Sequence, residues 1–174
     1  MDAISDLDFP LFNFRIDEIR AAIALNQLHK LDDRLNRSRQ NYQAVTAALV
    51  DIPAIHLRTP VADDACLGDM LVFRLKDASA AQAVDFAARL NRAGIEARAF
   101  GNTDKNVRRY WDWRFLFPQM SLSDIRSILP NTTCYLDQVI DIPLSPLLAN
   151  HDIARLIGVI KDLLNDDLQK RTTA

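Results

Sequence analysis

The sequence predicts an α+β domain, with helices packed on a small, mainly antiparallel sheet. Two patterns support this prediction: a long stretch with helical apolar spacing, and short apolar runs typical of strands that alternate with further helical stretches. The chain has 174 residues, of which 49% are apolar, so it can bury one good core. We expect a single domain whose helices cover one face of the sheet. The order of the strands is not readable from the sequence.

The first predicted element is one long helix, or two nearly collinear helices, running from Ile16 and ending before Pro53. Its apolar residues recur with a period near 3.6, as on one face of an α-helix. The segment AAIAL at residues 21–25 is richer in small residues than a surface helix requires. Small side chains let another backbone approach closely, so we expect this turn to pack against something large.

The sequence pattern in the middle of the chain predicts a compact α/β unit. Residues 53–69 contain prolines, a glycine and aspartates, so they read as a loop with one short extended piece at IHLR. MLVFRL at 70–75 is typical of a buried strand, and 78–94 of a helix closed by Gly94. IEARAF at 95–100 predicts a second strand.

The C-terminal part predicts further helices around one more strand. A short helix is expected at 121–129, and Asn131 can cap another helix through about Gln138. VIDIPLSP at 139–146 reads as an extended run halted by prolines. Asn150 caps a final amphipathic helix, and the charged tail from Asp166 is expected to fray.

Composition excludes several classes of function. A formal charge of -2 gives no reason to expect a nucleic-acid partner. No run approaches the roughly 20 apolar residues that span a bilayer, and the acidic N-terminus lacks a signal peptide's apolar run, so no membrane partner is expected. Cys66 and Cys134 have no CxxC spacing, which suits a reducing cytoplasm. The histidines, His29, His56 and His151, have no metal-ligand spacing.

No catalytic residue is expected in the chain itself. Neither a nucleophile elbow nor a Cys-His pair is recognisable. Lysines are scarce, and all of them lie in polar contexts that would not activate a nucleophile. The glycines form no phosphate-binding loop, which excludes an independent Rossmann or P-loop site.

The segment LFNFRIDE offers a candidate anion-binding site. Asn13 can both donate and accept hydrogen bonds, and Arg15 is a forked cation suited to phosphate or carboxylate. Both precede a helix whose N-terminus carries partial positive charge. The alternative is an asparagine cap with an arginine that pairs with Asp17 or Glu18.

A second candidate site is the aromatic and basic run RRYWDWRF at 108–115. It could be a loop in which rings stack on a sugar or nucleotide and arginines hold anionic groups. The candidate substrate-binding residues are then Arg109, Tyr110, Trp111 and Trp113. The alternative is a core plug made by Trp111, Trp113 and Phe115, with the arginines facing water.

Several motifs, in one order, resemble the C-terminal small domain of sugar aminotransferases of the DegT/DnrJ/StrS type. The family shows Asn-x-Arg-Met-x-Glu, an Ala-Ala-containing helix and Gln-Leu, then an L-x-x-x-G-I step and a P-N-A segment that ends in L-x-L-P-L-x-P. The similar pieces here are NFRIDEIRAAIALNQL, LNRAGIEAR and LPNTTCYLDQVIDIPLSP. The resemblance covers about residues 10 to 165.

This resemblance implies a pyridoxal phosphate enzyme that moves an amino group, usually from glutamate, to a keto sugar. It implies a role in sugar or polysaccharide biosynthesis, on a nucleotide-linked sugar or a sugar acid. In that family a homodimer completes each active site. The asparagine of the Asn-x-Arg motif reaches the cofactor phosphate in the partner subunit. Carried over, Asn13 contacts that phosphate, with Arg15 as a nearby anion or structural partner.

Departures from the family pattern leave the substrate unassigned. Leu11 stands where the family has glycine, and Ser145 replaces the histidine of its Leu-Pro-Leu-His-Pro run. The family's large domain, which carries the Schiff-base lysine, is not among these residues, so we expect a C-terminal portion that is inactive alone. The expected organisation is a connector to a large domain at 1–12, the small domain at 13–168 and a tail at 169–174. The alternative is a stand-alone, non-catalytic module for dimerisation or sugar-nucleotide binding.

Overall fold

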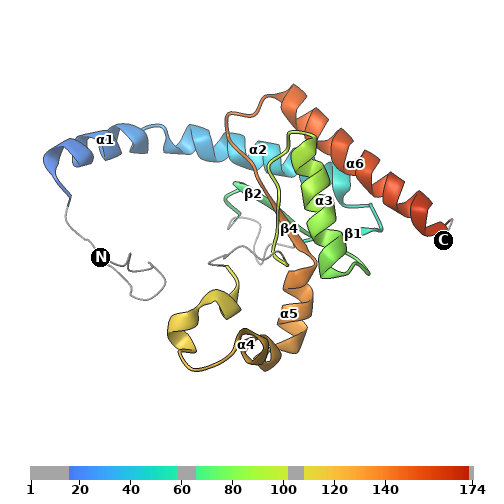
Figure 1. Cartoon of the computed structure of the whole chain (residues 1–174). Coiled ribbons are helices and arrows are strands. Elements are labelled where there is room, and N and C mark those ends of the chain that lie inside the picture. Colours follow the sequence, from blue (N-terminus) through green and yellow to red (C-terminus); the bar gives the residue numbers. More distant parts are fainter. Residues whose placement is uncertain (1–15, 59–65, 102–107, 173–174) are drawn as a thin grey trace.

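The structure is a computed structural model that describes residues 16–58, 66–101 and 108–172, and it is an α+β fold (Figure 1). Asn13 and Arg15 therefore lie outside the described residues. The elements in chain order are α1 (Glu18–Leu28), α2 (Leu31–Leu49), β1 (Ile55–Leu57), β2 (Met70–Leu75), α3 (Ala80–Arg92), β3 (Arg98–Ala99), the 3₁₀ turns η2 (Tyr110–Asp112) and η3 (Arg114–Leu116), α4 (Leu122–Ile128), α5 (Pro130–Asp137), β4 (Val139–Pro143) and α6 (Asn150–Thr172).

The sheet is antiparallel throughout, with the strand order β1-β2-β4-β3. β4 is therefore central although it comes last in the chain. Phe73 pairs with Leu57 on one side and Ile140 on the other, and Ile140 in turn pairs with Ala99. The predicted strands at 70–75 and 139–143 are confirmed, the one at 95–100 shortens to β3, and the extended piece IHLR contains β1.

One face of the sheet packs against α2, α3 and α6, which together enclose the main core. This agrees with the expectation that helices cover one face. In α3 the capping box of Ser79 and Gln82 fixes the first turn, and Gly94, at φ 80°, follows the last turn as predicted. The buried helix residues that form this core include Val45, Leu49, Ala83, Phe86, Leu90, Ile153, Leu156, Ile160 and Leu164.

The other face of the sheet carries charged side chains. Side chains alternate between the two faces along a strand, so the residues between the core positions project to this second face. Leu71, Phe73 and Leu75 of β2 belong to the main core, so Arg74 projects to the opposite face. The same alternation places Asp141 of β4 on this polar face, next to Arg98 of β3, with which it is in register.

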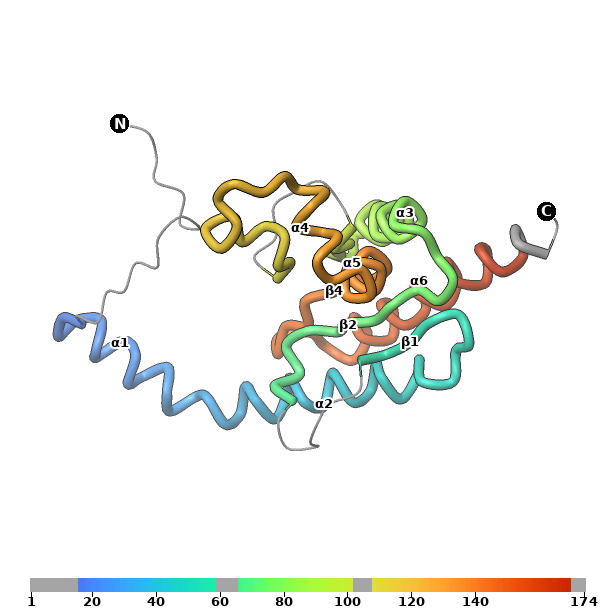
Figure 2. Tube along the Cα trace, turned by 90° about the horizontal axis from the view of Figure 1, so that it is seen from below, coloured from blue at the N-terminus to red at the C-terminus, as the bar shows by residue number. Residues whose placement is uncertain are grey.

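The long N-terminal helix is confirmed as two segments that follow one another, α1 and α2, with a break at His29 and Lys30. α2 contributes Val45 and Leu49 to the core, whereas α1 contains no buried residue. In both views α1 extends away from the sheet and its helices (Figures 1 and 2). α1 is therefore an arm whose side chains gain nothing from this chain's own core.

Three predicted helix ends differ from the observed ones. α6 begins at Asn150 itself, so Asn150 is not its cap; the residue before it, Ala149, donates its N–H to the Asp152 carboxylate at 2.9 Å. α5 begins at Pro130, with Leu129 in the N-cap position, so Asn131 is not its cap. α6 continues through Thr172 instead of fraying from Asp166, because Asp167 pairs with Arg89 of α3 at 2.5 Å and ties the last turns to the domain. Among the described helices, none is long and apolar enough to span a membrane.

Candidate functional site

The first turn of α1 is capped by an acidic side chain. Asp17 accepts a hydrogen bond from the backbone N–H of Arg20 at 2.8 Å, and its carboxylate also pairs with the Arg20 guanidinium at 3.0 Å. The cap is therefore Asp17, whereas the alternative reading of the sequence assigned it to an asparagine. The roles predicted for Asn13 and Arg15 concern residues outside the described part of the chain, and they stay predictions.

The aromatic run folds into a small unit of its own, which we call the aromatic module and define as residues 108–138. It comprises η2, η3, α4 and α5, and lies below the sheet in Figure 1. Its core holds Tyr110, Trp111 and Ile125, with Trp113 and Phe117 among the partly buried residues that pack against them. The sequence predicted no clean secondary structure at the start of this module, and short 3₁₀ turns stand there.

Arg109 is buried inside this part of the molecule, with 3% of its surface exposed. Its Nε donates to Asp112 at 2.6 Å, and a terminal nitrogen donates to the backbone carbonyl of Phe100 at 2.8 Å. Its guanidinium also lies over the Trp111 ring, 5.5 Å from the ring centre. These contacts join the module to the end of the sheet.

Two arginines contact the Trp111 ring, because Arg126 lies 4.4 Å from the ring centre in addition to Arg109 at 5.5 Å. Arg126 is fixed in turn by Asp137 at 2.5 Å. The Tyr110 hydroxyl is hydrogen bonded to Thr133 at 2.7 Å and donates to the backbone carbonyl of Arg126 at 3.0 Å. These contacts explain why a segment rich in polar residues can bury a tryptophan.

The structure thus brings together Arg109, Tyr110, Trp111 and Trp113, the residues predicted to bind substrate. Neither interpretation of the run describes all of them: Trp111 is a core residue, Arg109 is buried rather than solvated, and Phe115 is exposed. Of the four, Trp113 is only partly buried. Contact with a substrate stays a prediction for each of them.

A buried carboxylate joins the module to the sheet. Asp141 of β4 is 0% exposed, and its Oδ2 accepts a hydrogen bond from Arg108 at the start of the module. Arg98 of β3 approaches Oδ1 at 3.9 Å, yet Oδ1 accepts no hydrogen bond. Burial raises the pKa of Asp141 above its ordinary value, and the positive charges of Arg108 and Arg98 oppose this rise without reversing it.

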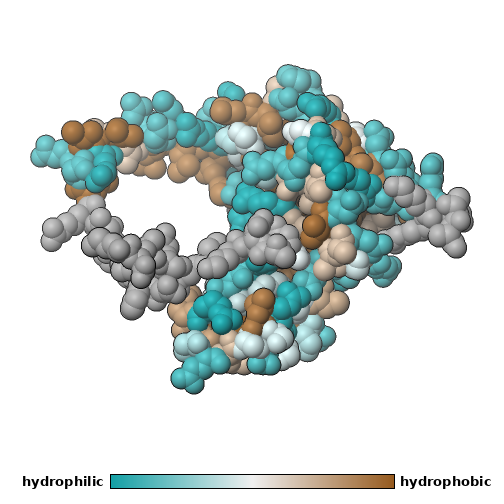
Figure 3. All heavy atoms as spheres, in the orientation of Figure 1, coloured by the Kyte–Doolittle hydropathy of each residue, from teal (hydrophilic) through white to brown (hydrophobic). Residues whose placement is uncertain are grey.

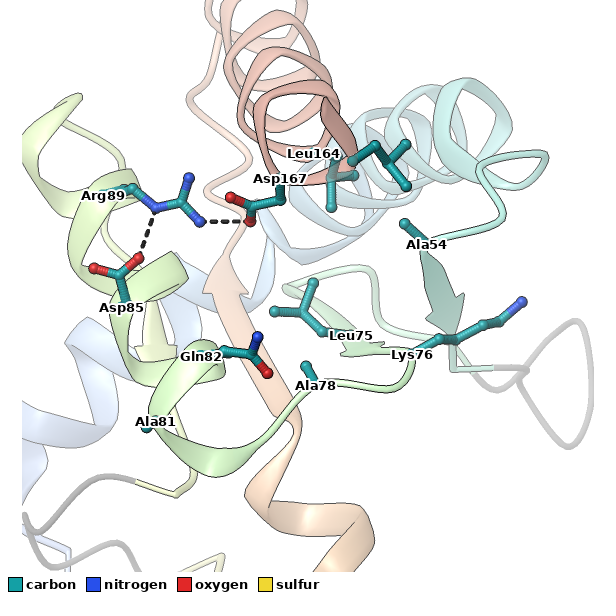
Figure 4. Close-up of a pocket in the computed structure, with 11 residues that line it drawn as sticks. Ala54, Leu75, Lys76, Ala78, Ala81, Gln82, Asp85, Arg89, Leu164 and Asp167 are labelled. Atoms are coloured by element: carbon teal, nitrogen blue, oxygen red, sulfur yellow. Dashed lines mark hydrogen bonds and ion pairs between the residues drawn. The ribbon is translucent and has the colours of Figure 1, made fainter. Parts of the chain in front are cut away.

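A pocket of about 470 Å³ opens between α3, α6 and the end of β2 (Figure 4). Leu75, Leu164 and Ala78 line its apolar part. On one wall Arg89 bridges Asp85 at 3.0 Å and Asp167 at 2.5 Å. The charges on that wall are thus paired with one another, and the wall serves to join α3 to α6.

Asp141 and Arg126 are residues that sequence reasoning missed. Asp141 stands in VIDIP, where apolar residues on both sides of a lone aspartate in a strand were the available signal for a buried, paired carboxylate. Arg126 had no comparable signal, because LSDIRSI reads as an ordinary exposed helix turn. Only the fold places its guanidinium on Trp111.

Several solved structures with a similar fold are aminotransferases with longer chains. Helicobacter pylori PseC, an aminotransferase involved in pseudoaminic acid biosynthesis, matches with a TM-score of 0.67 and 17% identity over 89% of this chain and 39% of its own. 3-Amino-5-hydroxybenzoic acid synthase matches with a TM-score of 0.68 and 20% identity, over 88% of this chain and 40% of its own. The sugar aminotransferase CalS13 of Micromonospora echinospora matches with a TM-score of 0.61 and 22% identity, over 93% of this chain and 41% of its own. The chain therefore spans about 40% of the length of these proteins, and at these identities the likeness concerns the fold.

The amino-acid sequence matches a family profile across nearly its whole length. The match runs over residues 6–161, from before the Asn-x-Arg motif into α6. It therefore includes the aromatic module and every strand of the sheet. On this match, the chain belongs to the DegT/DnrJ/EryC1/StrS aminotransferase family.

Proposed function

We propose that this chain supplies the C-terminal small domain of a pyridoxal phosphate-dependent aminotransferase that acts on a keto sugar. The observation that carries this proposal is the family match over residues 6–161, which contains both Asn13 and Arg15. The keto sugar is nucleotide-linked or a sugar acid, by analogy with the role of PseC in pseudoaminic acid biosynthesis. The free thiols Cys66 and Cys134 suit a cytoplasmic reaction.

Asn13 and Arg15 have the hydrogen-bond donors needed to bind part of the cofactor phosphate. An asparagine amide and an arginine guanidinium both donate N–H groups, which is the chemistry that phosphate oxygens require. The first turn of α1 adds little, because the Asp17 carboxylate already occupies the N–H of Arg20. In this proposal Asn13 holds the phosphate, Arg15 lies nearby, and the remaining donors come from a large domain or a partner subunit.

Pyridoxal phosphate, when bound, supplies the electron sink that lets an amino group pass from a donor to an acceptor. We assign the anchoring lysine to the large domain, since the lysines of this chain lie in polar contexts. The small domain then positions the phosphate and the substrate. Arg109, Tyr110, Trp111 and Trp113 would act on the substrate side, with the partly buried Trp113 as the residue most accessible to it.

The second part of the proposal is a homodimer, or a large-domain contact, formed by α1. Ile19 is 75% exposed, and Ile23, Leu25 and Leu28 are exposed as well. A helix with such side chains in water gains about 25 cal/mol for each Å² of apolar surface that a partner covers. The small residues of AAIAL, at 21–25, would let the partner's backbone come close.

The test is to purify the protein from its own cells through a tag appended after Ala174 and to assay the assembly obtained. We expect bound pyridoxal phosphate, visible by absorbance, and transfer of ¹⁵N from labelled glutamate to a keto sugar, measured by mass spectrometry. Replacing Asn13→Ala should weaken cofactor binding roughly tenfold, because one phosphate hydrogen bond is lost.

Asn36→Ala is the matched control, since Asn36 is an exposed asparagine on α2, outside both the motif and the proposed α1 interface. It should leave cofactor affinity unchanged. An assembly without pyridoxal phosphate and without amino transfer would refute the enzymatic role. Equal cofactor affinity in the Asn13 variant and the control would refute the phosphate contact alone.

A further inference from the structure

The buried and half-buried arginines of this fold follow a common rule. Among the described residues four arginines are not exposed to solvent, and three of them pair with a carboxylate. Such pairing is expected, because a guanidinium withdrawn from water needs a negative partner for its charge and acceptors for its N–H groups. The pairs are Arg89 with Asp167, Arg109 with Asp112, and Arg126 with Asp137.

Arg74 is the exception. It is partly buried on β2, and its Nε is withdrawn from water without any hydrogen-bond partner. Its guanidinium lies over the ring of Tyr135 on α5, 5.2 Å from the ring centre. The ring stabilises the positive charge, but it offers no lone pair that could replace a carboxylate as acceptor for the N–H groups.

The neighbours of Arg74 do not supply that acceptor either. Its register partners on the flanking strands are His56 on β1 and Val139 on β4. Asp141, the buried carboxylate of the same sheet face, is in register with Val72 and is already hydrogen bonded to Arg108. The surroundings of Arg74 thus hold a cation, an imidazole and a phenol, which are groups that can all donate hydrogen bonds to an oxyanion.

We propose that Arg74, with His56 and Tyr135, forms a binding site for a small oxyanion, a phosphate or carboxylate group, on the polar face of the sheet. His56 and Tyr135 are exposed, so a ligand can reach the site from solvent. The planar fork of a guanidinium matches the spacing of two phosphate or carboxylate oxygens, which a lysine ammonium does not. This inference does not depend on the aminotransferase proposal.

The experiment is a titration of the whole 174-residue chain with inorganic phosphate at constant ionic strength. The Nε–Hε signals of the arginine side chains are followed by NMR, and the Arg74 signal is identified by its loss in Arg74→Lys. We expect a saturable shift of that signal in the wild-type chain. Binding, measured in parallel by calorimetry, should be at least tenfold weaker in Arg74→Lys, which keeps the charge but loses the fork.

Arg92→Lys is the matched control, because Arg92 is an exposed arginine on α3. It should bind phosphate as the wild type does. His56→Ala, at an exposed position, should also weaken binding with little effect on folding, which keeps the test valid if Arg74→Lys unfolds. No saturable shift, or the same affinity in the Arg74 and Arg92 variants, would overturn the proposal.

A second arm separates a free oxyanion from a carboxylate of another polypeptide. Acetate and a sugar phosphate are titrated in the same way, and the assembly purified from native cells is titrated beside the isolated chain. A free oxyanion site predicts binding in both preparations. Binding to the isolated chain but not to the assembly, together with loss of the assembly in Arg74→Lys, would show that a carboxylate of another polypeptide occupies the site and would overturn the small-ligand assignment.

Discussion

At the scale of single residues, Asp141 shows how one charge links two parts of the fold. Its neighbours along β4, Ile140 and Ile142, enter the main core, and the alternation of the strand sends the carboxylate to the opposite face. There Arg108 meets one oxygen, while the other stays buried without a hydrogen bond. Desolvation therefore outweighs the attraction of the arginines, and the pKa of Asp141 is raised.

The raised pKa of Asp141 predicts a definite pH dependence. The folded chain holds the Asp141 proton to higher pH than the unfolded chain, so this residue favours folding most below its ordinary pKa of 3.8. Its contribution is then lost as pH rises through the folded-state value. The unfolding free energy of the wild type minus that of Asp141→Asn should therefore fall as pH rises from 3.8 through the folded-state pKa, by at most ~1.4 kcal/mol per pH unit.

Urea denaturation at a series of pH values measures this difference. Asp51→Asn, at an exposed carboxylate, serves as the control for the loss of one surface charge. A difference that grows with pH would mean that Arg108 and Arg98 stabilise the ionised carboxylate more than burial destabilises it.

At the scale of elements, the aromatic module is a satellite core built from short pieces. α4 has seven residues and α5 eight, too short to be stable as isolated helices in water. Their stability must come from packing around Trp111 and Tyr110, and from the arginine contacts on the Trp111 ring. The module therefore depends on one large side chain to an unusual degree.

Trp111→Ala tests this dependence. Removing a fully buried tryptophan should lower the free energy of unfolding by about 3–5 kcal/mol, measured by urea denaturation. Near-ultraviolet circular dichroism should report the loss of packing around Tyr110. Phe115→Ala is the comparison, because Phe115 belongs to the same segment but is exposed, and it should change stability little. An unchanged stability in Trp111→Ala would assign Trp111 to ligand contact instead.

At the scale of the whole molecule, α1 is an arm without a core of its own. Figure 3 shows hydrophobic residues on this arm, well away from the body of the domain. No residue of α1 is buried, although its apolar content is that of a packed helix. Long helices gain most of their stability from packing, so α1 is the element that an additional chain or domain would stabilise most.

Ala22→Arg tests the proposed α1 interface on the whole chain. The wild type should self-associate as its concentration rises, measured by sedimentation velocity, and the variant should stay monomeric because a large cation replaces a methyl group in the AAIAL turn. Thermal stability of the domain should hardly change, since α1 buries nothing in it. Ala47→Arg, at an exposed alanine of α2, is the control and should associate like the wild type. A wild-type chain that sediments as a monomer at all concentrations would count against self-association.

Local patterns in the sequence predicted most of the elements. Helical periodicity located α1, α2, α3 and α6, and the run MLVFRL located β2, because these signals depend on residues close in sequence. The order β1-β2-β4-β3 was not predictable, since strand pairing is decided by contacts between distant segments. The end of α6 was missed for the same reason: a partner on α3, Arg89, holds Asp167 in place.

By itself, the sequence determined the α+β class, the polar and apolar character of each segment, and the motif order that agrees with the family match. Tertiary structure alone decided which charges are paired. Arg109 and Arg126 look like surface residues in the sequence, yet folding places each beside a carboxylate and the Trp111 ring. Folding also pairs the buried Asp141 with Arg108, 33 residues away. It also left the Nε of Arg74 without a hydrogen-bond partner among the described residues. Pairing depends on distances in space, and a sequence pattern gives these only within a helix turn or a strand.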